Sequence, residues 1–201
     1  NRQGGAAGGM EYGVNNFVFR GNLSAQRTGD YQTPIGKIPN SSSWSRSGSF
    51  GIGYYGEKAW ISGTFSRDVR RYGIPFAGLF HEHHEEGEEE EEEEEEEHEV
   101  DVDLRSRTNN FRVAGGLRNL TGPALSGLQF NVNFGKYRHT EIEIEEGIEE
   151  VGTIFDNKTL SYRTLFEQQK SGRLTGRFGF EGLEGVGLHG HPLVRPGGIA
   201  C

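Results

Sequence analysis

The sequence predicts an all-β fold, an antiparallel transmembrane β-barrel fragment of about eight long strands with long external loops. Three observations predict it. Apolar and polar residues alternate over segments of roughly 10–18 residues, whereas strands of soluble proteins usually have about 5–6. The connections between segments are alternately short and long. One face of the segments is aromatic and aliphatic and the other carries Arg, Asn, Gln and Ser, as lipid outside and a polar lumen inside require. These features favour a membrane barrel over a soluble β-sandwich with one solvated face.

Four strands are predicted in the first part of the chain. The first is rich in glycine, which permits close backbone approach and strand bending. A turn at Asn15 and Asn16 leads to the second, whose apolar residues alternate from Phe17 to Ala25. A polar loop over 28–44 precedes the next two strands, which a tight turn over 56–58 joins. The predicted ranges are 4–13, 17–26, 46–55 and 59–71.

The other four strands follow an acidic external loop over 72–99. Alternation is clearest from Leu128 to Phe134, and a second acidic loop is predicted over 144–151. The pattern stops near Leu183, so residues 1–183 are predicted to form a partial barrel. Residues 184–201 are predicted to be an irregular, non-native tail, as in a truncated or frame-shifted reading. The predicted strand ranges are 100–118, around 128–134, 153–169 and 173–181.

The net charge of −9 conceals a mildly basic body. Fourteen glutamates lie between His81 and Glu99, and without them the chain has 16 acidic residues against 21 Lys and Arg. The arginines are scattered along the strands rather than clustered, which argues against nucleic-acid binding. Cys201 is the single cysteine, so neither an internal disulfide nor a thiolate metal site is predicted. No Ser, Lys or carboxylate pair has a recognisable catalytic setting, so no enzyme activity and no required cofactor are predicted.

The acidic loop contains the first candidate metal site. Imidazole is a good ligand for zinc and carboxylate an adequate one, and without thiolates Zn²⁺, Cu²⁺, Ni²⁺ and Mn²⁺ all remain candidates. Ordering a flexible loop opposes binding, so a labile, low-affinity site is expected. The alternative is a solvated run of charge that binds ions without specificity. The candidate ligands are His81, His83, His84, Glu85, His98 and Glu99.

A second candidate site lies near the external end of the sixth strand. His139 and Glu141 alternate with Glu143 and Glu145, so all four are predicted to share one side of the strand, the lumen side. His139 and Glu141 could line an ion path beneath the loop, and a polar lumen surface holding water is the alternative. Asp101 and its alternate neighbour Asp103 are weaker candidates for the same role.

Several segments, in order, resemble the early barrel of TonB-dependent outer-membrane receptors. The chain most resembles the members implicated in zinc uptake, which carry an external loop rich in His and acidic residues after a Tyr-Gly-Ile/Leu-Pro motif. The resemblance covers about residues 3–183 and is more specific for the family than for the ligand. The segments that carry it are Gln26–Pro34, Lys37–Asn40, Arg71–Phe76, Val102–Ser106, Gly135–Glu143 and Gly152–Lys158.

The resemblance implies a bacterial outer-membrane location, lipid as a partner, and uptake of a metal ion or metal chelate, with zinc as the first candidate. The family has an N-terminal plug domain and a barrel of 22 strands. This chain shows neither in full, so contact with TonB is expected only through a plug domain that this chain lacks. The alternative is a small non-transporting outer-membrane barrel, structural or adhesin-like, because eight strands can close by themselves. Pairing of the first strand with the last would distinguish that alternative from an open receptor fragment.

Overall fold

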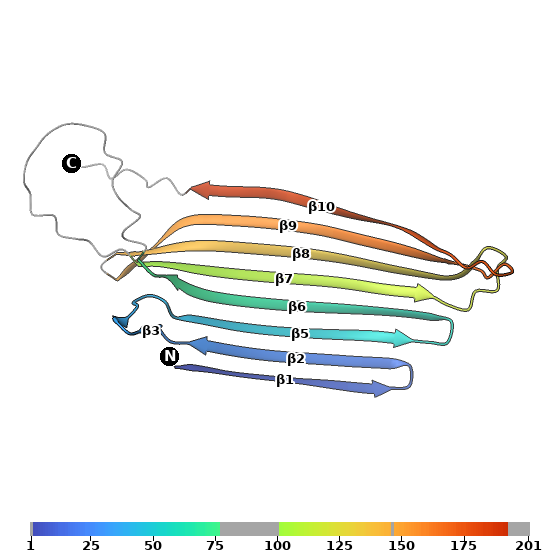
Figure 1. Cartoon of the computed structure of the whole chain (residues 1–201), viewed down its shortest axis with the longest axis horizontal. Helices are drawn as coiled ribbons and strands as arrows, with labels where there is room; N and C mark the ends of the chain where they lie inside the picture. The colour runs from blue at the N-terminus through green and yellow to red at the C-terminus, as the bar shows by residue number, and fades with distance from the viewer. Residues whose placement is uncertain (1, 77–100, 146, 193–201) are drawn as a thin grey trace, which may run out of the picture.

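The computed structural model describes residues 2–76, 101–145 and 147–192. Within these ranges the regular structure is all β, and eight strands form one antiparallel sheet in the order β1-β2-β5-β6-β7-β8-β9-β10 (Figure 1). A small hairpin of β3 and β4 lies in the connection between β2 and β5. The described residues contain no helix that is long and apolar enough to cross a membrane. The strands are β1 Gln3–Val14, β2 Phe17–Thr28, β3 Gln32–Thr33, β4 Gly36–Lys37, β5 Ser43–Tyr55, β6 Ala59–Ile74, β7 Asp101–Leu117, β8 Leu125–Glu145, β9 Ile148–Gln168 and β10 Arg177–Pro192.

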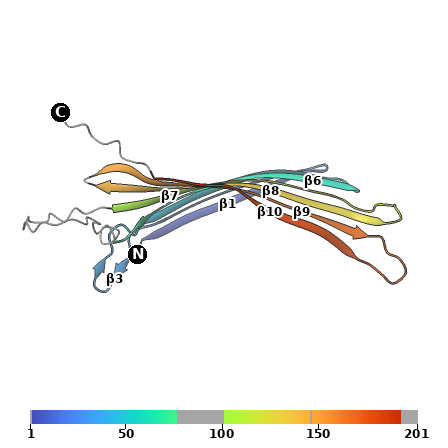
Figure 2. The same ribbon diagram turned by 90° about the horizontal axis from the view of Figure 1, so that it is seen from above.

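The sheet confirms the prediction of eight long antiparallel strands but is open. Its strands have between 12 and 21 residues, and each pairs with its neighbours in antiparallel register. β1 and β10 are the two edges, and no pairing joins them in the part of the chain that the structure describes. Turned by 90°, the sheet is a single twisted and curved layer (Figure 2). Closure into an eight-stranded barrel is therefore not found.

The predicted acidic loop over 144–151 is instead the tip of a hairpin. β8 continues to Glu145 and β9 begins at Ile148. Gly147 has φ +82°, a left-handed conformation that glycine adopts without steric cost. The prediction was wrong because it followed the charge of the glutamates. Isoleucines alternate with them, and this period of two continues the strand.

The last strand also differs from its prediction. It spans Arg177–Pro192 rather than 173–181, so residues 184–192 continue the sheet where an irregular tail was predicted. The register with β9 shifts between Gly185 and Leu188, which marks a β-bulge. Pairing with β9 thus extends the strand past the point where the sequence alternation ends. The rest of the predicted tail, residues 193–201, lies outside the described residues.

The register divides the sheet into two chemically different faces. Residues directly opposite each other in an antiparallel pair point to the same side. On one side, here called the apolar face, Phe50 is opposite Phe65, and Phe65 is opposite Phe111. The other side, the polar face, carries Asn22, Ser49 and Ser66 in the neighbouring row. The central row of the apolar face is Met10, Gly21, Phe50, Phe65, Phe111, Phe134, Leu160 and, on β10, Glu184.

Two further rows of the apolar face lie nearer the tight turns at 15–16 and 56–58. Together with the central row they form the apolar band, and their large side chains are mostly exposed, as for Phe50 at 58% and Phe111 at 51%. These two rows are Tyr12, Phe19, Ile52, Gly63, Val113, Val132 and Tyr162, and then Val14, Phe17, Tyr54, Ile61, Gly115, Phe130, Thr164 and Phe180.

Beyond the band, toward the end of the sheet with the 29–42 connection, the apolar face becomes charged. The last uncharged residue before this change is Ala25 on β2 and Leu160 on β9. Leu160 lies two rows closer to the tight turns than Ala25. At about 3.3 Å per residue and about 4.8 Å between strands, these two end points give an average slope of roughly 30° to the direction across the strands. The change of row occurs between β2 and β6, because Arg67, Lys136 and Lys158 share one row. The first charged side chains on five of the strands are Arg27, Arg46, Arg67, Lys136 and Lys158, which we call the basic border.

The few buried side chains gather at the same end of the sheet, beyond the basic border. Val102 and Leu104 of β7 are each 7% exposed, and Ile142 of β8 is 4% exposed. The Asn40 amide donates hydrogen bonds to the carbonyl oxygens of Ile74 and Val102, which fixes the 29–42 connection against β6 and β7. The described sheet therefore has a small packed region at one end and no central core.

Candidate functional site

The predicted ligands of the acidic loop lie outside the described residues. Residues 77–100 include all six of them, so this candidate site stays a prediction. The strands on either side are placed, because β6 ends at Ile74 and β7 begins at Asp101, opposite Ile144. Both strands meet this loop at the end of the sheet that carries the 29–42 connection. The ligands concerned are His81, His83, His84, Glu85, His98 and Glu99.

His139 and Glu141 lie on the polar face of β8, in the same register as Asn131 and Asn133, as predicted. His139 is opposite Ser106 on β7 and Phe155 on β9. Its Nε2 atom is buried and has no hydrogen-bond partner among the described residues. The described residues hold no group of three or more His, Cys, Asp or Glu side chains placed to bind a metal ion. The structure thus places these two residues on one face and adds no third ligand to them.

Asp103, the weaker candidate, has a different role. It lies on the apolar side of β7, beside Gly73, and is only 3% exposed. Its carboxylate accepts a hydrogen bond from Arg71 in a close ion pair. We interpret this pair as a structural contact, because a buried carboxylate without its cation would destabilise the fold. Asp103 therefore does not share a surface with His139.

A set of arginines on the apolar face was missed by the sequence reasoning. Arg105 donates a hydrogen bond to Glu149 at 2.6 Å, and Arg138 donates two hydrogen bonds to Asp156, at 2.7 and 2.8 Å. Along a single strand these residues are widely spaced among polar ones. They become neighbours only through the register between strands. The signal that could have found them is the alternation of arginines on β7 at positions 105 and 107.

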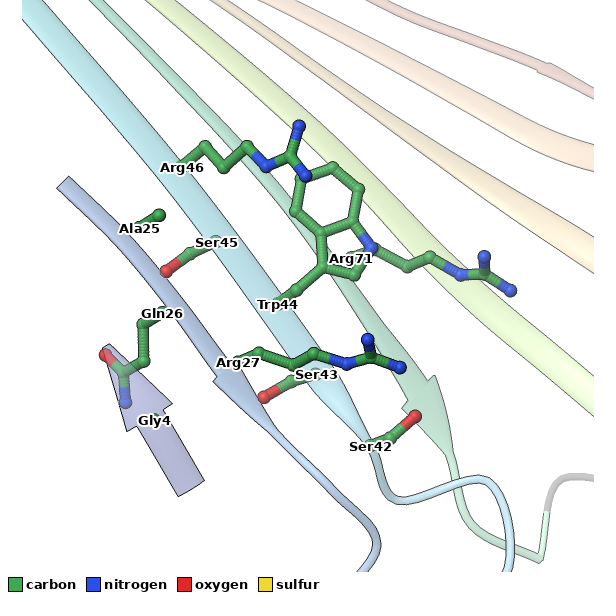
Figure 3. A pocket seen from close by; sticks show the side chains of 10 residues that line it. All are labelled: Gly4, Ala25, Gln26, Arg27, Ser42, Ser43, Trp44, Ser45, Arg46 and Arg71. Carbon is green, nitrogen blue, oxygen red and sulfur yellow. The ribbon is translucent and has the colours of Figure 1, made fainter. Parts of the chain in front are cut away.

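Three arginines and Trp44 line a shallow groove of about 470 Å³ at one end of this charged region (Figure 3). Arg27, Trp44 and Arg71 are opposite one another on β2, β5 and β6. The guanidinium of Arg46 lies 5.3 Å from the centre of the Trp44 ring, a cation–π contact that holds it beside the groove. No acidic side chain lines the groove, so the surface suits an anion. We call it the arginine groove.

The connection between β2 and β5 contains a carboxylate with a clear electrostatic partner. Asp30 pairs with Lys37 at 2.7 Å, and its other oxygen accepts a hydrogen bond from the Ser41 backbone amide at 3.1 Å. The hydrogen bond from Lys37, opposed in part by burial and supported by the Ser41 amide, lowers the pKa of Asp30 below its usual 3.8. The ionised carboxylate therefore stabilises this connection.

A pH titration tests this assignment. Because the pKa of Asp30 is lower in the folded chain, its stabilising effect is present above the usual pKa and is lost as the pH falls through the folded value. Carboxyl carbon NMR of the full chain should show Asp30 titrating below pH 3.8. Lys37→Met should raise that midpoint, whereas Lys136→Met, on a distant strand, should not. Equal midpoints in the native chain and Lys37→Met would contradict the assignment.

No protein-family model matches the chain, and no curated protein matches it significantly. The features of the chain that bear on its function are the two faces of the sheet, the arrangement of charge along the boundary of the apolar band, and the ordered segments of resemblance.

Proposed function

We propose that the chain forms part of the wall of an outer-membrane β-barrel, with its apolar face toward lipid and its polar face toward the lumen. The apolar band carries this proposal. The band occupies three rows from β1 to β9 and reaches β10 at Phe180, and most of its phenylalanines are about half exposed, including Phe65 at 47% and Phe134 at 43%. A soluble protein rarely leaves a continuous apolar patch of this size open to water. Lipid would cover it.

The slope of the boundary supports the same orientation. Strands of outer-membrane barrels are tilted by about 35–45° from the membrane normal, so the lipid surface crosses them obliquely. The boundary of the apolar band slopes on average by roughly 30° across the strands, in the same sense as such a tilt would produce and a little below its usual size. A surface that packs against a second sheet would not need an edge of charge along its apolar area.

We further propose that this wall belongs to a receptor of the TonB-dependent type, and that its cargo is a divalent metal ion, zinc first, or a metal chelate. The ordered segments of resemblance support the receptor class. The open edges β1 and β10 favour a segment of a wider barrel over a closed barrel of eight strands. His139 and Glu141 lie on the polar face toward the end where the His- and Glu-rich connection leaves the sheet. Cations could therefore pass from that connection to the lumen side.

Zinc titration calorimetry of the full chain in octyl glucoside micelles tests the metal proposal. We expect binding in the native chain and a loss of affinity of about tenfold or more when the loop histidines are removed, because imidazole supplies the better ligands for zinc. The variant carries alanine at His81, His83, His84 and His98.

A matched control removes the two other closely spaced histidines, His189 and His191, and should leave the affinity unchanged. A third variant, His139→Ala with Glu141→Gln, asks whether the polar face contributes. Unchanged zinc affinity in the four-histidine variant would contradict capture by this segment and leave the wall proposal unaffected. The wall proposal is tested separately, by comparing the loss of stability caused by Phe111→Lys with that caused by Asn110→Lys.

A further inference from the structure

The basic border has a chemistry that the transport proposal does not use. All five of its side chains are exposed, and none forms an ion pair within the described residues. Three other arginines of this face do have acidic partners, namely Arg71, Arg105 and Arg138, whereas exposed Arg107 of β7 forms no ion pair among the described residues. Lys136 and Lys158 interact electrostatically with Asp156 in the sheet, although neither forms a direct ion pair with it. The border cations left for a partner outside the sheet are therefore Arg27, Arg46 and Arg67.

The arginine groove concentrates this charge at the β2 side of the border. Arg27 and Arg46 contribute two cations without an acidic partner among the described residues, whereas Arg71 is balanced by Asp103. Guanidinium groups bind phosphate through paired, charge-assisted hydrogen bonds, which makes arginine the side chain best suited to that anion. The stacking of Arg46 on Trp44 keeps its guanidinium near the groove at a small entropic cost.

An apolar surface adjoins the groove on the side of the apolar band. Ala25 lies in the next row on β2, followed by Leu23, which is 73% exposed. Phe50, 58% exposed, is one row further on β5. A ligand that fits this surface has an anionic head at the arginines and hydrocarbon chains along Leu23 and Phe50. That is the chemistry of a phosphate-bearing lipid and not of a free anion.

We propose that the arginine groove binds the phosphate of a lipid headgroup, and that the rest of the basic border contacts the phosphates of neighbouring lipids. The inference rests on the proposed position of the sheet in a membrane and adds the lipid class that it recognises. The border supports this occupant over an acidic protein segment because its charges follow the sloping edge of the apolar band. A membrane surface has that shape. Basic side chains at this depth are the usual receptors for lipid phosphates.

The test uses the full chain in octyl glucoside micelles, with bisphosphorylated lipid A or its dephosphorylated analogue added. Trp60→Phe in every sample leaves Trp44 as the single tryptophan, so its emission reports on the groove. The border variant carries glutamine at Arg27, Arg46 and Arg67. The control variant carries glutamine at Arg20, Arg112 and Arg163, which remove the same charge from the polar face.

We expect the native chain and the control variant to bind bisphosphorylated lipid A about tenfold or more tightly than the dephosphorylated analogue, a preference that the border variant loses. The preference should also weaken as salt is raised, since the border is exposed. Lipid A and its analogue binding equally well would overturn the inference, and so would equal losses in the two variants. An emission change at the same concentration of inorganic phosphate would show a simple anion site and overturn the assignment to lipid.

Circular dichroism of the same samples distinguishes a failure of the lipid-phosphate site from a failure of the proposed membrane wall. A chain that forms β structure in the neutral micelles but shows no phosphate preference lies in the membrane without the lipid site. A chain that remains unfolded in the micelles contradicts the membrane wall itself and the lipid site with it.

Discussion

Replacing Phe111 by lysine is expected to lower the stability of the chain in phosphatidylcholine vesicles by about 2 kcal/mol, because the cost of a lysine on the lipid face falls from about 2–4 kcal/mol at the bilayer midplane to about 0–1 near the interfaces. Phe111 lies in the row of the apolar band next to the basic border, with Phe65 on one side and Phe134 on the other. Lysine there must either carry its charge into hydrocarbon or bend away at the expense of packing. Urea unfolding in vesicles measures the difference.

The neighbouring residue provides the matched control. Asn110 precedes Phe111 and points to the polar face, opposite Ser66 and Gly135. Asn110→Lys therefore adds the same charge at the same depth on the side assigned to the lumen, and its cost should stay within about 1 kcal/mol. Equal costs at 110 and 111 would contradict the orientation of the two faces. A smaller cost at 111 than at 110 would reverse it.

Replacing Arg71 by methionine is the second large effect, and we expect a loss of about 3 kcal/mol. The substitution keeps much of the side-chain volume but leaves the carboxylate of Asp103 without its cation. That side chain is 5% exposed, so water replaces the partner poorly. Breaking a buried pair by removing one member typically costs about 3–5 kcal/mol, and the 38% exposure of Arg71 argues for the lower end.

A double-mutant cycle isolates the pair. Asp103→Asn in the Arg71→Met background should recover much of the loss, because the uncompensated charge is then gone. Arg163→Met is the comparison for an exposed pair, since Arg163 and Glu181 are 3.9 Å apart on the polar face and both are largely exposed. Its cost should be about 1 kcal/mol or less. No recovery in the double variant would show that Arg71 stabilises the sheet through packing and not through Asp103.

The sequence pattern was sufficient for the strands whose alternation is regular. The segments around Phe17 and Phe65 were predicted within a few residues, because a period of two fixes both the strand and the face of each side chain. It failed where charge and periodicity disagree, as in the glutamates and isoleucines of the β8–β9 hairpin. It failed again in β10, where pairing with β9 and not the alternation sets the end.

The candidate site was predictable only in its local part. That His139 and Glu141 share a face follows from spacing along one strand, and the structure agrees. The arginine groove could not be found in that way, because Arg27, Arg46 and Arg71 belong to three strands. Their proximity depends on the register of two hairpins and on the length of the 29–42 connection. Neither quantity is encoded in the spacing of one segment.

In the proposed membrane position, the boundary of the apolar band would also make the bilayer select the correct strand pairing. A hairpin that slips by two residues keeps each side chain on its proper face, so it loses little in water. In lipid the same slip would draw Arg67 or Lys136 below the boundary and into hydrocarbon. Mispaired hairpins that survive in solution would thus be rejected during insertion. The cations at the edge of the band would set the register of each strand against its neighbours.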